Sequence, residues 1–451
     1  MDPSAATRRR FFRQAARAGG GLAGVAGLGS VGLAACAPGG APAPKSTTQE
    51  GEVTWMIADY GANAGQQWFD QTFVPGFLKD RPKVKVNMLY TSWGDLGQKR
   101  DTLYAAGQGP DLIQSGAGQS YAYRKLVVPI DDRVKRWKEW GDYYPSALAT
   151  STWKDKPFGV PAKLDARSMV YRQDLFQRQG LKLPETWDEM RQAAVALTKS
   201  DGATLTQVGF DPSDWDGSGG YQRFVPHAWQ NGGEIISQDG RKCLLNSTEC
   251  VDGLKYWTDL FNQIAPLSMA LPAAPPNASR LAGGSAAAIL AGQWIQQGAI
   301  QALPEAVAQI VVRPPLRQKR AQTDLFSNWY GLGSQSKLLD LAWDLLMYFN
   351  RGENLIEYLR LNVSTPPRKG LPDTGYLTDP RYQLKTWSEV LEKYSRPYPL
   401  FIAQTGTDPN GALSAAMRAV REGRKSPKEA LDETARLWQE SLDGGAREVG
   451  L

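Results

Sequence analysis

The start of the folded chain alternates between buried strands and helices, and this alternation restricts the fold more than any other feature. Residues 53–58 (VTWMIA) form an apolar run typical of a buried strand, residues 66–80 place aromatic side chains at helical spacing, and residues 84–89 (VKVNML) predict a second strand. A helix over residues 95–106 and a short strand ending at Ile113 follow. Strands that alternate with helices build a parallel sheet covered on both faces. The sequence therefore predicts an α/β fold.

Two later helices are predicted from signals at their N-termini. Thr186 and Glu189 have the spacing of a capping box and stand ahead of apolar residues at helical spacing. Ser426 and Glu429 repeat this pattern, with proline at the first helical position. We therefore expect the chain to end in a helix.

The first 35 residues have the pattern of an export signal. Three arginines at positions 8–10 precede two phenylalanines and an uncharged run from residue 19 to residue 35, which fits a twin-arginine-type signal. The run is rich in glycine, and each glycine inside a helix costs about 1 kcal/mol relative to alanine, so cleavage explains it better than a membrane span. We expect the protein at the outer face of the cytoplasmic membrane or in the periplasm.

The segment Leu33-Ala-Ala-Cys36 has the form of a lipobox, in which the cysteine is acylated and becomes the new N-terminus. We expect Cys36 to carry a lipid anchor; an ordinary signal with an incidental cysteine is the alternative. Residues 36–50 are rich in proline, glycine and alanine and cannot build a core, so they are predicted to form a flexible tether. The folded part then begins near Gly51.

The formal charge of +6 owes much to the leader. Without residues 1–35, which hold five arginines and one aspartate, the charge falls by four to +2. The rest of the chain has no basic cluster with interleaved aromatic residues, so nucleic-acid binding is not expected. His227 is the only histidine, which argues against histidine metal sites and Ser-His-Asp catalysis. We expect neither a metal nor a cofactor.

Four segments resemble, in their order and spacing, motifs of extracytoplasmic solute-binding protein family 1, the group that includes maltodextrin-binding protein. They are AAGQGPDLI at 105–113, KPFGVP at 156–161, the run YRQDLF, GL and PETWDEM within 171–190, and LAGGSAAAILAGQW at 281–294. The third is the most specific. The fourth has Leu281 and Ser285 where the family has phenylalanine and lysine. The resemblance covers roughly residues 52–443.

The resemblance implies two α/β lobes in the type II arrangement of periplasmic binding proteins. Each lobe is expected to be a mainly parallel sheet flanked by helices, with the ligand cleft between the lobes. About 400 residues follow the tether, which is more than one hydrophobic core usually serves. The crossovers are expected near residues 160–165 and 326–331, the first lobe over residues 51–161 and 330–375, and the second lobe over residues 162–328 and 376–451.

The resemblance also implies a function, namely the solute-binding subunit of an ABC importer. Such a subunit is expected to be a monomer that closes on a mono- or short oligosaccharide and delivers it to a membrane permease. A polyol or a glycerophosphodiester is the alternative ligand. A secreted glycoside hydrolase is the alternative from another class, because it needs two carboxylates about 5–9.5 Å apart, and Asp165 and Asp216 could meet in the cleft. The order of the motifs favours binding without chemistry.

A sugar site needs aromatic planes for the C–H faces of the ring and polar side chains for its hydroxyls. The resemblance makes Trp294 the main stacking surface and places Asp165 and Arg167 on the first crossover, where a purely structural ion pair is the alternative. The other candidates follow predicted strands or lie in loops, with turn or core positions as the alternatives: Asp59, Tyr60, Trp93, Ser115, Gln119, Tyr121, Trp215, Asp216 and Trp329. No aromatic residue stands at 405–408, which argues against a long oligosaccharide.

Cys243 and Cys250 are two further cysteines of an exported chain and lie close in sequence. Because an oxidising compartment favours disulfides, we expect them to be bonded. The alternative is a pair of small buried side chains, since Cys250 shares helical spacing with Leu254, Trp257 and Phe261.

Overall fold

The computed structural model describes residues 50–58, 63–115, 119–213, 215, 219–398, 403–404 and 406–450, without the side chains of residues 63 and 64. The predicted signal segment, nearly all of the predicted tether and four predicted site residues lie outside these ranges: Cys36, Asp59, Tyr60 and Asp216. Among the described helices, none combines the length and the apolar character that crossing a membrane requires.

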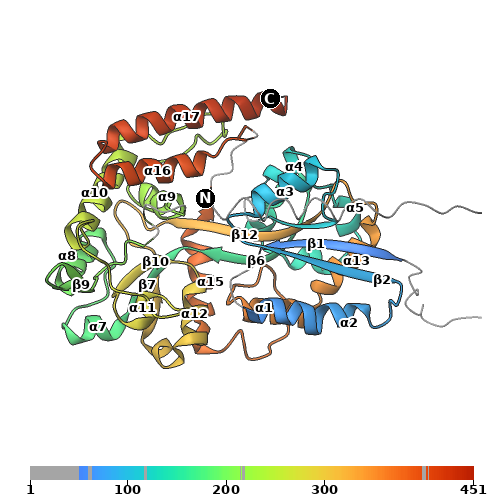
Figure 1. Cartoon of the computed structure of the whole chain (residues 1–451), viewed down its shortest axis with the longest axis horizontal. Coiled ribbons are helices and arrows are strands. Elements are labelled where there is room, and N and C mark those ends of the chain that lie inside the picture. Colours follow the sequence, from blue (N-terminus) through green and yellow to red (C-terminus); the bar gives the residue numbers. More distant parts are fainter. Residues whose placement is uncertain are drawn as a thin grey trace, which may run out of the picture. The chain divides into compact units, whose positions relative to one another are not determined.

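The larger sheet contains the alternating elements expected at the start of the folded chain (Figure 1). β1 (Gly51–Ala58) lies between β2 (Val84–Thr91) and β3 (Leu112–Ser115) and is parallel to both. β3 also pairs antiparallel with β12 (Thr323–Leu332), which comes from much later in the chain. The α/β prediction is confirmed.

Aromatic side chains form the core beneath this sheet. The rings of Trp55 and Phe349 are fully buried and meet edge to face, with their centres 5.4 Å apart. We call the elements packed around these two residues the first lobe. Besides β1, β2 and β3 they are α1 (Asn63–Trp68), a π-helical turn (Phe69–Phe73), α2 (Val74–Leu78), α3 (Leu96–Ala105), α4 (Ser120–Tyr123), α5 (Asp131–Val134), a 3₁₀ turn (Lys138–Asp142), α6 (Pro145–Ala149), the hairpin β4 (Thr152–Trp153) and β5 (Lys156–Pro157), α13 (Leu339–Phe349) and α14 (Gly352–Leu361).

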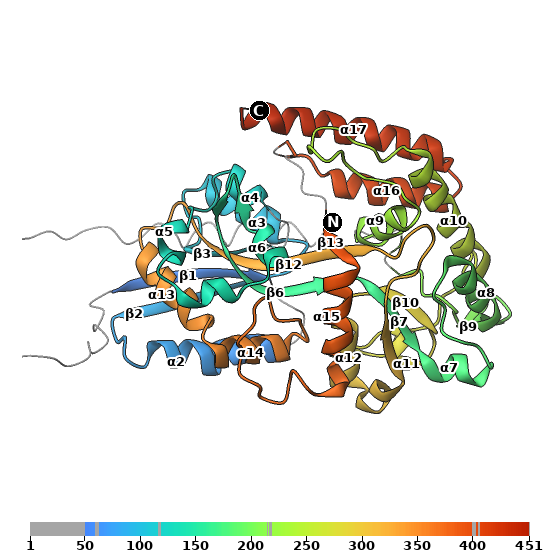
Figure 2. The same cartoon turned by 180° about the vertical axis from the view of Figure 1, so that it is seen from behind.

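Two long strands run between this lobe and the rest of the chain. β6 (Val160–Ala166) pairs antiparallel with β12 along most of its length. One half of β12 also pairs with β3 in the first lobe, whereas its other half pairs with β13 (Ser395–Pro397). Figure 2 shows the two strands passing through the centre, with α15 (Leu384–Lys393) beside β6.

The second sheet differs from the parallel arrangement expected for each lobe. β7 (Ser168–Arg172) lies between β10 (Ala288–Ala291) and β11 (Ile310–Arg313) and is antiparallel to both. β10 and β11 run in the same direction and are joined through α12 (Trp294–Ala302). β7 follows β6 after a single residue, so the crossover sets its direction, opposite to that of its two neighbours.

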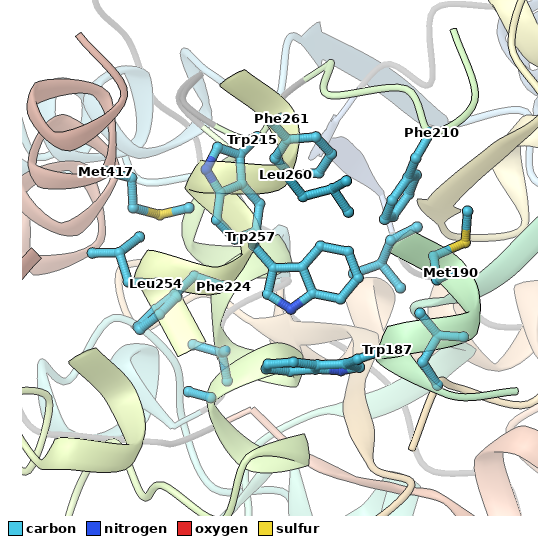
Figure 3. Packing of buried hydrophobic residues seen from close by; sticks show 14 of the residues in the cluster. Trp187, Met190, Phe210, Trp215, Phe224, Leu254, Trp257, Leu260, Phe261 and Met417 are labelled. Carbon is cyan, nitrogen blue, oxygen red and sulfur yellow. The ribbon is translucent and has the colours of Figure 1, made fainter. Parts of the chain in front are cut away.

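Large aromatic side chains also fill the core next to this sheet (Figure 3). Trp257 packs against Trp187 and Phe210, with ring centres 5.2 and 5.4 Å apart. We call the elements around Trp257 the second lobe. Besides β7 and β10 they are α7 (Gln173–Arg178), α8 (Trp187–Leu197), β8 (Lys199–Asp201), β9 (Thr204–Gln207), α9 (Tyr221–Gln230), α10 (Thr248–Ile264), α16 (Pro409–Arg421) and α17 (Pro427–Glu448); β11, α11 (Arg280–Gly283), α12 and a 3₁₀ turn (Pro304–Gln309) lie around them. A further 3₁₀ turn (Pro380–Tyr382) precedes α15, and its Tyr382 packs in the core of the first lobe.

Both predicted capping boxes are confirmed. The Thr186 hydroxyl accepts a hydrogen bond from the Glu189 backbone N–H at the start of α8, and the Glu189 carboxylate accepts one from the Thr186 backbone. Ser426 and Glu429 do the same at the start of α17. α17 is also the predicted C-terminal helix.

The predicted disulfide is wrong, because Cys243 and Cys250 are both free thiols. Cys250 lies on the buried face of α10 together with Trp257, and its thiol donates to the Glu234 carbonyl oxygen at 3.6 Å. Burial raises the pKa of the Cys243 thiol to about 11 and that of Cys250 to about 12. The two residues therefore act as small core side chains, which is the alternative that helical spacing suggested.

Candidate ligand-binding site

Trp294 is one of the few large apolar side chains that the described residues expose. It is the first residue of α12, and 39% of its surface is accessible. The guanidinium carbon of Arg167 lies 4.3 Å from the centre of its ring, and that of Arg223 lies 5.8 Å away. A tryptophan ring is the best acceptor for such cations. Trp294 is thus a partly exposed aromatic plane with two positive charges over its ring.

Arg167 is held in place by groups from the crossover and from α9. Its guanidinium donates to Asp165 Oδ2 at 3.2 Å and to the side-chain oxygen of Gln222. It also lies 4.7 Å from the centre of the Phe326 ring. Asp165 and Arg167 therefore form the ion pair that the sequence analysis gave as the alternative to a ligand contact. The second oxygen of Asp165, Oδ1, has no hydrogen-bond partner within the described ranges.

Asp324 adds a second carboxylate that the sequence analysis missed. It lies on β12 and is fully buried, and neither carboxylate oxygen has a hydrogen-bond partner among the residues described. Burial raises the pKa of Asp324 to about 7; the charges of Arg167 and Arg223 oppose this rise, and that of Asp165 adds to it. The sequence signal that could have identified Asp324 is a single charged residue inside an apolar strand, since such a charge is seldom buried without a partner.

A small pocket, with a cavity volume of about 20 Å³, lies at the carboxyl ends of β1 and β2. Ala58 and Tyr90 line it from these strands, and Gln297 lines it from α12. Ala58 immediately precedes the predicted contacts at residues 59 and 60, and Trp93, which is 41% exposed, follows Tyr90 by three residues. Ligands in α/β folds bind at the carboxyl ends of strands. The pocket and Trp294 are therefore linked through the first turn of α12.

Three of the predicted aromatic contacts are core residues instead. Trp329 and Tyr121 are buried and pack edge to face, with ring centres 5.7 Å apart. Trp215 is buried against Phe261 and His227 at 5.1 and 5.6 Å. β12 is covered on both faces, and the aromatic core of the second lobe receives the tryptophan of the glycine-rich loop. The composition of the surrounding segments did not show that these three rings are buried.

The polar candidates after β3 also differ from the expectation. Ser115 is fully buried opposite Trp329 in the sheet, and its hydroxyl has no partner in the described part of the chain. Gln119 is partly buried, and its amide donates to the Ala149 carbonyl oxygen at 3.5 Å. Ser115 is therefore not accessible to a ligand in this structure.

Comparison with known proteins agrees with this architecture. A relative from Brucella abortus, named as a binding protein, is 28% identical over 198 residues, which are 43% of this chain and 46% of that protein. The diacetylchitobiose binding protein of Streptomyces coelicolor is 23% identical over 274 residues, or 59% of this chain and 62% of that protein. The matches to the Brucella relatives thus span about half of their length.

Solved structures share the fold over a longer part of the chain. An ABC transporter solute-binding protein from Thermotoga lettingae, bound to α-D-tagatose, superposes with a TM-score of 0.73 at 20% identity, covering 87% of this chain and 99% of that one. The type II two-lobed fold is thereby established. The family model described as "Bacterial extracellular solute-binding protein" matches residues 59–351. Because this match covers more than half of its residues, the chain belongs to the bacterial extracellular solute-binding protein family.

Proposed function

We propose that the protein is the solute-binding subunit of an ABC importer and captures a mono- or short oligosaccharide between its lobes. The observation that carries this proposal is the platform of Trp294, Arg167 and Asp165 beside the crossover strands. An aromatic face with its negative quadrupole suits the C–H surface of a sugar, and a carboxylate and a guanidinium bond to hydroxyls.

The geometry favours a short ligand. Of the five predicted aromatic contacts that the structure describes, Trp294 and Trp93 are partly exposed, whereas Trp215, Trp329 and Tyr121 are buried. One or two exposed planes suffice for one or two sugar rings. Of the comparison proteins described above, one is named for diacetylchitobiose and another was solved with α-D-tagatose bound, and both ligands are small carbohydrates.

Binding would proceed by closure of the lobes about β6 and β12, which is common in this architecture. In the proposed mechanism the first lobe supplies the pocket at the ends of β1 and β2, and the second lobe supplies Trp294. Asp165 Oδ1 would accept a ligand hydroxyl, while Oδ2 keeps Arg167 in place. The closed shape would be recognised by the membrane permease.

A thermal-shift screen with mono-, di- and trisaccharides, polyols and glycerophosphodiesters tests the ligand class. Specific binding stabilises the native state by about 2.7 kcal/mol at a hundredfold excess over Kd, which is several degrees in melting temperature. A shift with saccharides supports the proposal. A shift only with polyols or phosphodiesters would show that the ligand is not a saccharide. The appearance of new reducing ends when the protein is incubated with an oligosaccharide would indicate a hydrolase instead of a binding protein.

We further propose that the protein is exported through a twin-arginine-type signal, anchored by a lipid on Cys36 and active as a monomer. Cys36→Ala should release it from membranes in cell fractionation, whereas Cys243→Ala serves as the matched control. Persistence of the Cys36 variant in the membrane fraction would refute the anchor.

A further inference from the structure

Three glutamines at the start of α12 flank Trp294 in the sequence. Gln293 precedes it, and Gln296 and Gln297 follow it. All three side chains belong to residues that are at least nine-tenths buried. Buried amides need hydrogen-bond partners. The positions of these partners show which other parts of the protein the start of α12 is bonded to.

The partners lie in the first lobe, in the crossover and in the segment of residues 381–387. The Gln297 amide donates to the Leu361 carbonyl oxygen at the end of α14, at 2.5 Å. The Gln296 amide donates at 3.2 Å to the carbonyl oxygen of Arg381, and its side-chain oxygen accepts from the Trp387 indole N–H at 2.6 Å. α12 itself packs with the second lobe. The Gln297 hydrogen bond therefore crosses from one lobe to the other, whereas Gln296 binds the segment that leads into α15.

Gln293 differs from these two because it binds at the pivot. Its side chain contacts the Thr365 hydroxyl at 2.6 Å, and Thr365 is bridged to Leu164 of β6. In the amide orientation that satisfies both of its polar atoms, it accepts from Thr365 and donates to the Leu164 carbonyl oxygen at 3.1 Å. A hinge motion about β6 would displace this contact less than the Gln297 contact.

We propose that Gln297, with Gln293 at the pivot, forms a glutamine clasp that favours the closed arrangement of the lobes before a ligand binds. The inference rests on the proposed function, because it takes Trp294 as a ligand contact. Trp294 and Gln297 are three residues apart and so lie on one face of the helix. The clasp thereby holds the stacking surface toward the pocket that Gln297 itself lines.

The strength of such a clasp follows from the chemistry of its bonds. When the lobes open, the amides and carbonyls form hydrogen bonds with water instead of with each other. A neutral hydrogen bond therefore has only a modest net effect on the free-energy difference between the closed and open arrangements. The apparent affinity falls in proportion to the fraction of binding-competent protein. Loss of one clasp bond should therefore weaken ligand binding by roughly 2- to 10-fold.

The test compares Gln297→Leu with Gln301→Leu, an exposed glutamine four residues further along the same helix. In small-angle X-ray scattering of the ligand-free protein, Gln297→Leu should increase the radius of gyration, and Gln301→Leu should not. Isothermal titration with the saccharide that gives the largest thermal shift should show a 2- to 10-fold loss for Gln297→Leu alone.

A second variant guards against a simple folding defect. Gln297→Glu places a carboxylate against the Leu361 carbonyl oxygen, so the lobes should open at neutral pH and close again when the acid is protonated. If both Gln297 variants match Gln301→Leu in scattering and affinity, or lower only the melting temperature, the clasp is refuted. If no saccharide binds any variant, the proposed function fails, while the scattering of the ligand-free protein still decides the clasp.

Discussion

The guanidinium of Arg167 lies 4.3 Å from the centre of the Trp294 ring, so a cation from the crossover contacts the exposed tryptophan of the second lobe. The same guanidinium is paired with Asp165 at 3.2 Å. A ligand that stacks on Trp294 must therefore use the ring surface that Arg167 leaves open, because the guanidinium lies over the ring. Arg167 orients the platform as well as contributing to it.

Replacing Arg167 by lysine tests this role. The charge is kept, but the planar fork that bonds Asp165 and Gln222 and stacks on the ring is lost. Hydrogen bonds to charged groups contribute about 1.5–3 kcal/mol, so we expect titration calorimetry to show affinity reduced by about tenfold or more. Arg313→Lys, at an exposed position on β11, is the control. Equal affinity in both variants would exclude Arg167 from the site.

Asp324 predicts a pH dependence of stability. Its pKa is about 7 in the folded protein and 3.8 ordinarily, so between about pH 4 and pH 7 the native state retains a proton that the unfolded chain has lost. Stability then decreases as the pH rises through this range and levels off above the folded pKa. Asp324→Asn should raise the melting temperature, with a gain that grows from pH 5 to pH 8.

The control for Asp324 is Asp201→Asn, which changes an exposed carboxylate on β8. Its effect on the melting temperature should be small at every pH. A loss of stability in Asp324→Asn at pH 8 would mean that attraction by Arg167 and Arg223 outweighs the burial of the charge, and the assigned direction of the pKa shift would be wrong.

The free cysteines predict the chemistry of a Cys36→Ser variant. Unfolded without reductant, it should release two titratable thiols, those of Cys243 and Cys250. In the native state both should react slowly with iodoacetamide, because the thiolate is the nucleophile and burial raises both thiol pKa values. Detection of no thiol in the unfolded protein would mean that the pair is bonded.

Local patterns predicted the fold better than the site. The capping boxes at Thr186 and Ser426 depend on residues a few positions apart, and the apolar run of β1 depends on its own composition, so both were readable from the sequence. The exposure of Trp294 and the burial of Trp215 depend on which distant helices cover them. The antiparallel sheet around β7 depends likewise on the path of the crossover.

The charged cluster was only half predictable for the same reason. Asp165 and Arg167 came from a motif on the first crossover. Asp324 and Arg223 come from two other elements, and only the packing of α9 against β12 brings them to the same place. Contacts between segments a hundred residues apart leave no mark on the spacing within either segment.

The most direct test of the proposed site is calorimetric titration of Trp294→Ala with the saccharide identified by thermal shift. Leu437→Ala, which changes an equally exposed apolar residue on α17, is the control. We expect the affinity of Trp294→Ala to fall at least tenfold, about 1.4 kcal/mol, with a melting temperature close to that of the control. Unchanged affinity together with a melting temperature several degrees lower would show that Trp294 supports the fold and that the ligand binds elsewhere.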